Sequence, residues 1–477
     1  MRTPISVALF LLACVLAAPA AQKPLFTDAS PPSEFAARRA KVMAEIGDAV
    51  AIVSGTTEQP NYEKFKQNKQ FFYLSGVEVP RAILLLDGRA RSSTLFLPAR
   101  NPGMERSEGP LLAPGAEAER LTGIERVVDR ETFNAAVAAL AAERRTMFVP
   151  FRRESIGAVA VDRVRAHDRA TAADPWDGRP SKEAVFREKL QAAAPGSEVA
   201  DLDPILDDMR LVKSPNEIAL VREATRISSL AIREAMRSAK PGMYEYELEA
   251  VADYVFKRHN AMGIGYFALA ATGANAAWPH YHAAQSRLAD GDLVLFDYAP
   301  EFKYYTSDVT RMFPANGTFS PRQRELYGIY LALYQALMAS IGPGPAAPRL
   351  EAAHVRMQTI LATFRFTDPK IRAAAEAFVA RYAGPRESYG HWVGLEVHDV
   401  AGRSFDGTYE PGMIFTIEPA LTIDDERVYI RLEDVILITE TGYENLSGDL
   451  PMDIDGIERV MRELGLADLW RARGGGR

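Results

Sequence analysis

Short apolar runs alternate with amphipathic segments through the first part of the chain. An apolar run bounded by turn residues predicts a buried strand, whereas apolar residues three and four apart predict a helix. The runs that we assign to strands are Ala49–Ser54, Phe71–Leu74, Ala82–Leu86 and Thr94–Leu97. Glu34–Ile46 and Thr132–Arg145 have the period of helices. This alternation predicts an α/β segment with a mixed or parallel sheet over residues 26–204.

The pattern changes after residue 204. Ser214, Pro215 and Glu217 match the start of a helix with a capping box, and this helix should run to about Lys240. A second helix is predicted at Glu245–His259, followed by strands, glycine turns and helices up to residue 464. We therefore predict a second domain over residues 205–464 and a flexible tail over residues 465–477.

The first domain carries charges but no cluster typical of a metal site. Its segment Asp162–Pro180 is polar and contains two prolines, so we interpret it as a surface excursion. His167 is isolated and is interpreted as a surface residue. The first domain is therefore predicted to have a structural or interface role.

The segment Leu293–Phe313 combines two apolar, strand-like runs with one acidic residue in or beside each, Asp297 and Asp308. A hairpin whose fold-back centre lies between Phe302 and Lys303 would place the two acids directly opposite each other. Their Cβ atoms would then be roughly 4.5–5.5 Å apart. Two half-buried anions so close repel each other unless a cation joins them. The segment therefore predicts a metal site.

A second hairpin of the same kind is predicted at Ile414–Leu437. Its arms carry Glu418 and Glu433, which oppose each other when the turn is centred between Asp425 and Glu426. Between the hairpins, a histidine-rich segment contains His391. Four carboxylates and one neutral imidazole suit a pair of manganese, iron, cobalt or zinc ions. The sequence thus predicts a pseudo-symmetric dinuclear site.

The formal net charge of −7 shows no excess of basic residues, and no basic stripe is apparent along the chain. A nucleic acid is therefore excluded as the main partner. Apolar residues make up 47% and charged residues 25% of the 477, as is ordinary for a globular protein of about two domains.

The N-terminus matches a secretory signal peptide at residues 1–20, with cleavage after Ala20. Arg2 supplies the positive start, and the apolar run Ile5–Leu16 is too short to span a membrane. We therefore expect a secreted or periplasmic protein with no transmembrane span in the mature chain. Two alternatives are a buried N-terminal helix and a lipid anchor through Cys14, the single cysteine.

Several motifs in the chain resemble one family, the aminopeptidase P, prolidase and creatinase group with its pita-bread catalytic fold. The motifs are FKQNKQFFYLSGVEVPRAILLL from Phe65, MRLVKSPNEI from Met209, NAAWPHYHA from Asn275, GDLVLFDYAPEFKYYTSDVTRMFPANG from Gly291, GHWVGLEVHD from Gly390, EPGMIFTIEPAL from Glu410 and YIRLED from Tyr429. The resemblance covers nearly the whole mature chain. It implies an α/β (α+β) protein in which a creatinase-like N-terminal domain precedes a pita-bread domain with pseudo-twofold symmetry.

The resemblance also implies roles for individual residues. Asp297 would bind one metal ion, Asp308 and Glu433 would bridge both, and His391 and Glu418 would complete the other. Glu418 would also accept and donate the proton while water activated by both cations attacks the scissile carbonyl. Two histidines, His280 and His398, would hold the substrate and stabilise the tetrahedral intermediate. Arg431 matches a family arginine that supports the ligands. Because all five ligands are present, the metal-free creatinase branch is disfavoured.

These features predict a secreted aminopeptidase that uses two divalent ions, with manganese favoured over zinc, cobalt or iron, to cleave the bond before proline in peptide substrates. We expect a homodimer or a higher homo-oligomer. Two departures from the family pattern are Tyr298-Ala299-Pro300 after the first ligand and Glu387-Ser388 before His391, where many members have His-Gly. A prolidase restricted to dipeptides and a non-catalytic binding protein on the same fold are the alternatives.

Overall fold

The computed structural model describes residues 29–58, 62–382, 389–400 and 407–472. The predicted signal peptide with Cys14 and the departure at Glu387-Ser388 lie outside the described residues. In the part that is described, no helix is long and apolar enough to cross a membrane.

The N-terminal part is built on a six-stranded mixed sheet in the order β4-β3-β2-β1-β5-β6. Its strands are β1 (Val50–Ser54), β2 (Ile83–Asp87), β3 (Ser92–Leu97), β4 (Arg126–Asp129), β5 (Met147–Val149) and β6 (Val199–Asp201). β2 pairs antiparallel with both β1 and β3, and the remaining pairs are parallel. The predicted strands at Ala49–Ser54, Ala82–Leu86 and Thr94–Leu97 are therefore confirmed.

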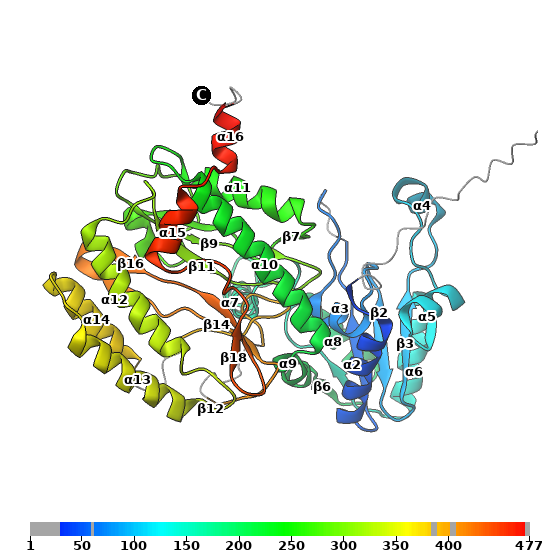
Figure 1. The fold of residues 1–477 in the computed structure, drawn as a ribbon. Helices are drawn as coiled ribbons and strands as arrows, with labels where there is room; N and C mark the ends of the chain where they lie inside the picture. Colours follow the sequence, from blue (N-terminus) through cyan, green and yellow to red (C-terminus); the bar gives the residue numbers. More distant parts are fainter. Residues whose placement is uncertain (1–28, 59–61, 383–388, 401–406, 473–477) are drawn as a thin grey trace, which may run out of the picture.

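Helices cover both faces of this sheet (Figure 1). They are α2 (Pro32–Glu45), α3 (Lys69–Ser75), α5 (Ala116–Thr122), the 3-10 turn η1 (Arg130–Thr132), α6 (Phe133–Ala142) and α8 (Lys182–Ala193). Helix α4 (Pro102–Glu108) buries no residue and lies apart from the sheet. Because side chains alternate along a strand, Ala51 and Val53 of β1 belong to one core cluster with α2, while Val50 and Ile52 belong to another with α6 and α8.

The assignment of Phe71–Leu74 to a strand was wrong, because these residues lie in helix α3. The Asn68 side chain caps this helix by accepting a hydrogen bond from Gln70 N, and Gly76 ends it with a left-handed φ of 68°. All the residues of α3 are buried, so the run is apolar without the period that marks a surface helix.

The polar segment after residue 161 lies mostly at the surface, as predicted, but its first half is a helix. This helix, α7 (Val161–Ala173), buries Val161 and Val164, and its start contacts the C-terminal part. The Val161 amide donates to the His398 carbonyl at 3.2 Å. His167, farther along α7, is exposed as predicted. Helix α9 (Asp203–Leu211) then leads into the second half of the chain.

The C-terminal part contains two similar units of helices followed by hairpin strands (Figure 1). The first holds α10 (Pro215–Ser238), α11 (Glu245–Arg258), β7 (Gly263–Ile264), β8 (Leu269–Thr272), η2 (Gly273–Ala277), β9 (Leu293–Asp297), β10 (Pro300–Glu301) and β11 (Thr310–Pro314). Helix α10 begins with the predicted capping box, in which Ser214 and Glu217 cap each other's backbone amides.

The second unit begins with α12 (Pro321–Met338), α13 (Ala346–Thr363) and α14 (Pro369–Arg381). Its strands are β12 (Gly344–Pro345), β13 (Thr408–Tyr409), β14 (Ile414–Ile417), β15 (Leu421–Ile423), β16 (Val428–Ile430), β17 (Asp434–Ile438) and β18 (Tyr443–Asn445), with the 3-10 turn η3 (Asp424–Glu426). Two helices close the chain, α15 (Ile454–Met461) and α16 (Leu466–Ala472), so the segment predicted as a flexible tail begins with a helix.

The two hairpins differ in how well their register was predicted. β14 and β15 pair with β17 and β16 about a centre between Asp425 and Glu426, as expected. In the first hairpin, β9 pairs with β11 so that Asp297 opposes Thr310 and not Asp308. The fold-back centre is one residue farther on, between Lys303 and Tyr304, because both residues adopt left-handed backbone conformations.

The two hairpins meet at one point, where Thr310 at the start of β11 forms an antiparallel bridge with Glu433. The Thr310 amide donates to the Glu433 carbonyl at 3.3 Å, and the Glu433 amide donates to the Thr310 carbonyl at 3.1 Å. This bridge brings the acid-bearing ends of both hairpins together at the centre of the C-terminal part.

Candidate metal centre

Asp297 and Asp308 lie on one face of the first hairpin, although they are not directly opposed. Asp308 precedes Thr310 by two residues, so it shares the face of Thr310 and of its partner Asp297. Both carboxylates are buried, with 2% and 5% of the residue exposed. The Tyr266 hydroxyl lies 2.6 Å from Asp297 Oδ1 and 2.7 Å from Asp308 Oδ1. Because a hydroxyl has one hydrogen, it satisfies one of these oxygens at a time.

The second half of the chain supplies His391, Glu418 and Glu433. The His391 Nε2 atom lies 3.4 Å from Asp308 Oδ2, 3.5 Å from Glu418 Oε1 and 3.7 Å from Glu433 Oε1. One ring nitrogen thus faces three carboxylates that come from both hairpins. The structure brings all five sequence-predicted metal ligands together.

His391 is held by the backbone of a strand-like segment beside β14. Its carbonyl accepts from the Thr416 amide at 2.8 Å, and its amide donates to Thr416 Oγ1 at 3.1 Å. A Cβ atom on Gly390 would lie 1.8 Å from the Thr416 carbonyl oxygen, so only glycine permits this approach. The segment therefore fixes the position of His391 relative to the second hairpin.

Arg431 supports the carboxylates from the side. Its guanidinium donates to Asp297 Oδ2 and, at 3.2 Å, to Glu418 Oε2. Burial alone would lower the pKa of this guanidinium, but the charges of Asp297, Tyr429 and Glu418 raise it well above its usual value. The sequence-predicted supporting role of Arg431 thus has a geometric basis in both hairpins.

The carboxylates repel one another as they stand. Burial raises the pKa of Asp308 well above its usual value, and the charges of Asp297 and Glu418 add to the effect. Burial, followed by the charges of Asp308 and Glu418, does the same for Glu433. Glu433 Oε1 is buried and accepts no hydrogen bond from the described residues. Divalent cations would relieve both conditions, so the residues present fit a metal centre.

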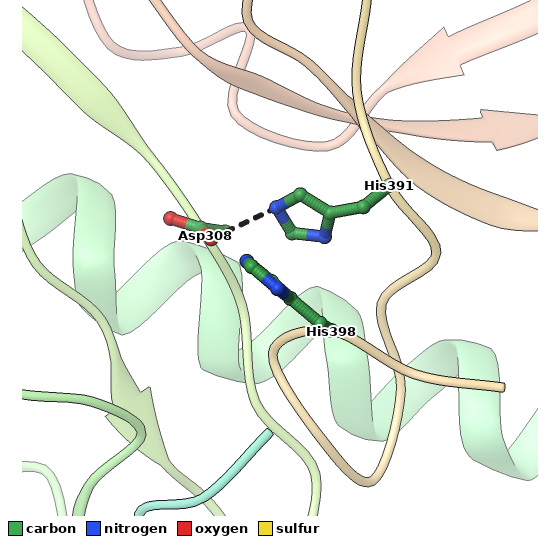
Figure 2. Close-up of side chains that lie close together, drawn as sticks. All are labelled: Asp308, His391 and His398. Atoms are coloured by element: carbon green, nitrogen blue, oxygen red, sulfur yellow. Dashed lines mark ion pairs between the residues drawn. The ribbon is translucent and has the colours of Figure 1, made fainter. Parts of the chain in front are cut away.

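Ligand atoms of the site form three overlapping groups, within each of which all atoms lie within 4.8 Å. One group joins Asp297, Asp308 and Glu433, a second joins His391, Glu418 and Glu433, and a third joins Asp308, His391 and His398. Figure 2 shows this third group, in which the two imidazoles lie side by side with their ring centroids 4.1 Å apart. His398 thus lies directly beside two of the predicted metal ligands.

His280 and His398 both line the pocket above the carboxylates. His398 Nδ1 lies 3.2 Å from Asp162 Oδ2 at the start of α7, and this contact lowers the pKa of Asp162 to about 2. Partial burial lowers the pKa of His280, and the positive charges of Arg163 and Arg431 lower it further. The imidazole of His280 is therefore biased toward its neutral form.

Two family models match the chain, one for metallopeptidase family M24 at residues 219–440 and one for the aminopeptidase P N-terminal domain at residues 35–150. The Xaa-Pro aminopeptidase of Escherichia coli is 31% identical over 449 residues, which cover 90% of this chain and 97% of that protein. The Xaa-Pro aminopeptidase of Haemophilus influenzae is 30% identical with the same coverage. The chain belongs to the aminopeptidase P family.

Solved structures of the family have the same architecture. Aminopeptidase P from E. coli with the inhibitor Pro-Leu superposes with a TM-score of 0.71 at 28% identity, over 90% of this chain and 98% of that one. Proline aminopeptidase P II from Yersinia pestis gives 0.70 at 31% identity, over 90% and 99%. The expected fold, an N-terminal α/β domain before a pita-bread domain, is confirmed, and so is the prediction of a metallo-exopeptidase.

The departure of this family member at Tyr298-Ala299-Pro300 leaves the metal centre intact. The Tyr298 side chain is buried away from the carboxylates, and its hydroxyl donates to Asp253 Oδ1 on α11 at 2.7 Å. Its ring packs 4.8 Å from that of Phe256. Pro300 lies in β10, paired with Ile264. Tyr298 therefore attaches the hairpin to α11, and Pro300 attaches it to β7.

Sequence reasoning missed two contributions to this aminopeptidase P-like site. Tyr266 stands in a short segment without charged neighbours, where an aromatic residue is usually part of the core. Asp162 and Arg163 come from the N-terminal domain, and no local pattern predicts that α7 reaches a pocket built more than a hundred residues later. Their only sequence signal is the charged start of a helical segment.

Proposed function

We propose that the protein is a dinuclear metal-dependent aminopeptidase that hydrolyses the Xaa-Pro bond at the N-terminus of peptides. The observation that carries this proposal is the convergence of His391 Nε2 with carboxylates from both hairpins at 3.4–3.7 Å. The relatives named Xaa-Pro aminopeptidase, which match nearly the whole chain, support it.

The five ligands would hold two divalent ions, manganese in our proposal, which when bound supply positive charge that polarises the scissile carbonyl and acidifies water. One solved E. coli relative is described as zinc-substituted, so zinc is an alternative to test. Asp308 and Glu433, whose pKa values are raised in the absence of cations, would become fully ionised ligands.

Glu418 is suited to move the proton in this reaction. Its side chain is 23% exposed, whereas that of Glu433 is 1% exposed, so Glu418 alone of this pair can reach solvent and substrate. It would take a proton from the attacking water and deliver it to the proline nitrogen that leaves. His280 and His398 would orient the peptide and donate hydrogen bonds to the carbonyl oxygen as it gains charge.

The test combines metal analysis with peptide hydrolysis. The purified protein should contain about two metal ions per chain and release the first amino acid from Xaa-Pro-Xaa tripeptides with manganese, cobalt or zinc. A chain that binds no metal and releases no amino acid would be a binding protein instead. A chain that cleaves Xaa-Pro dipeptides but not their tripeptide extensions would be a prolidase.

The variant Asp308→Asn isolates the bridging role of Asp308. It should abolish hydrolysis without unfolding the chain, because an amide cannot bridge two cations as a carboxylate does. Without metal, the variant should be at least as stable as the parent, since a neutral amide avoids the cost of ionising a buried carboxyl beside Asp297 and Glu418. Thermal melting and peptide release measure both effects, with exposed Asp455→Asn as control. Turnover retained in Asp308→Asn would contradict the bridging role.

We also propose that the protein is exported. Support comes from residues 1–20, whose positive start and apolar run match a signal peptide. Fractionation of cells that express the full chain tests this proposal. A cytoplasmic protein that still carries residues 1–20 would contradict it. The expected homodimer or higher homo-oligomer stays a prediction, which sedimentation of the purified chain would check.

A further inference from the structure

The first turn of α7 places one arginine, Arg163, in the wall of the metal pocket. Its guanidinium carbon lies 5.2 Å from the centroid of the Phe267 ring, which also lines the pocket. A cation–π contact of this kind fixes the guanidinium without using its N–H donors. The ring of Phe267 thus positions the Arg163 guanidinium and leaves its N–H donors available.

No acidic partner of Arg163 is present among the described residues. The preceding residue, Asp162, directs its carboxylate to His398 instead. Apart from the four carboxylates among the five proposed metal ligands, no acid lines the described pocket. The only other arginine in the pocket wall, Arg431, already donates to Asp297 and Glu418. Arg163 is an exposed residue at the pocket, so its N–H donors are open to a ligand.

The charges of the pocket favour an anionic ligand at this position. Two divalent cations would offset the four carboxylates, so the charges of Arg163 and Arg431 would leave the pocket lining with an excess of positive charge. The free α-amino group of a peptide substrate carries the same sign and would be repelled. A carboxylate on the opposite side of the scissile bond would instead form a charge-assisted, bidentate contact.

We propose that Arg163 binds a carboxylate of the peptide substrate on the proline side of the cleaved bond. This inference rests on the proposed Xaa-Pro hydrolysis and refines it to a substrate class. The carboxylate has two sources, the C-terminus of a dipeptide or an acidic side chain at the third residue of a longer peptide. Arg163 is therefore the residue that sets a preference for short or acidic peptides.

The test uses substrates that differ only in this charge. One pair is an Xaa-Pro dipeptide as the free acid and as the amide, and the second is an Xaa-Pro-Asp-amide and an Xaa-Pro-Asn-amide. The parent protein should prefer the acid in at least one pair, mainly through KM. A preference in the first pair identifies the chain end, and one in the second identifies the side chain.

Two variants of Arg163 and one control decide whether this residue causes the preference. In Arg163→Gln the ratio of kcat/KM for acid over amide should fall about tenfold, and Arg163→Lys should retain part of it because it keeps the charge without the planar fork. The exposed Arg169→Gln on the same helix is the control and should keep the parent ratio. An unchanged ratio in Arg163→Gln overturns the proposal.

A binding measurement separates this inference from the proposed function. Non-hydrolysable analogues, in which CH2–N replaces the scissile amide, are titrated as acid and as amide into the parent and Arg163→Gln by calorimetry. Tighter binding of the acid that is lost in the variant supports the role of Arg163 even if no peptide is cleaved. Equal affinities of acid and amide for the parent overturn that role, even if Xaa-Pro peptides are cleaved.

Discussion

Side chains other than the five metal ligands contact and support the groups of the pocket. Tyr266 offers its hydroxyl to both acids of the first hairpin, and burial together with their charges raises its pKa well above the usual value. Asp162 holds His398 from a helix of the N-terminal domain. The carboxylates of the first hairpin and the imidazole of His398 therefore each contact a residue outside the metal hairpins.

We expect Asp162 to act as a positioning residue for His398. With a pKa of about 2, its carboxylate stays ionised at any pH suited to assays. Asp162→Ala should lower kcat about tenfold with a smaller effect on KM, and Asp162→Asn should lose less because it keeps an acceptor oxygen. Both variants should melt within a few degrees of the parent, since the Asp162 side chain is 57% exposed. Equal kcat losses in both would argue against an acceptor role.

The residues of the metal centre were predictable from the sequence because carboxylates in apolar strands are chemically conspicuous. Asp297, Asp308, Glu418 and Glu433 each stand in or beside such a strand. Tyr266 carries no such signal, because tyrosine serves equally in cores. Contacts made across domains, such as that of Asp162, depend on how the chain packs as a whole, which local periodicity does not encode.

At the scale of elements, turn chemistry decides which predictions succeed. The second hairpin turns through a polar, acidic segment, which shows in the sequence where the turn is centred. The register of this hairpin was therefore predicted correctly. The first hairpin turns at Lys303-Tyr304, two residues that rarely adopt left-handed conformations, so neither residue type marks the centre of the turn. The buried helix α3 was missed for a related reason, since its apolar residues lack a polar face.

The close contact between Gly390 and β14 gives a prediction for one element. Gly390→Ala would place a Cβ 1.8 Å from the Thr416 carbonyl oxygen, so the segment that carries His391 must move. We expect a loss of about 1–3 kcal/mol in the free energy of unfolding and weaker metal binding. Urea unfolding and metal titration measure these effects. Gly407→Ala is the matched control, because a Cβ there meets nothing within 4 Å. Unchanged metal affinity in Gly390→Ala would show that His391 tolerates the shift.

At the scale of the whole molecule, the two parts share one hydrophobic core and several buried ion pairs. Glu301 of the first hairpin is fully buried and accepts from Lys66, while Lys69 Nζ lies 3.9 Å away. Burial lowers the pKa of Lys69, and the charge of Glu301 opposes that effect. The negative charge of Glu301 thus attaches Lys66 and Lys69 of the N-terminal domain to the first hairpin.

Removing that charge should destabilise the assembly of the two parts. Glu301→Gln leaves the buried Lys69 and the half-buried Lys66 without this anion, and breaking a buried ion pair typically costs about 3–5 kcal/mol. The control is Glu444→Gln, which breaks the exposed pair with Arg222 and should cost about 1 kcal/mol or less. Urea unfolding of both variants gives the comparison. Similar losses in the two variants would mean that the buried pair contributes no more than a surface pair.

Glu183, at the start of α8, is one source of the pH dependence of global stability. Its residue is 4% exposed, and neither carboxylate oxygen accepts a hydrogen bond from the described residues. Lys182 Nζ is 4.0 Å away but donates to Glu154, whose charge adds to the effect of burial. Together they raise the pKa of Glu183 from 4.5 to about 7.

The direction in which the free energy of unfolding changes follows from the pH at which the folded and unfolded states each release the proton of Glu183. Below pH 4.5 the carboxyl is neutral in both states and costs nothing. As the pH rises toward 7 the unfolded chain ionises first, so the free energy of unfolding falls by roughly 1–3 kcal/mol in total. Glu183→Gln should remove this fall, and its stability relative to the parent should therefore increase between pH 5 and pH 8. Urea unfolding at both pH values measures the difference, with exposed Glu188→Gln on the same helix as control. Parallel pH profiles of Glu183→Gln and the parent would place the source elsewhere.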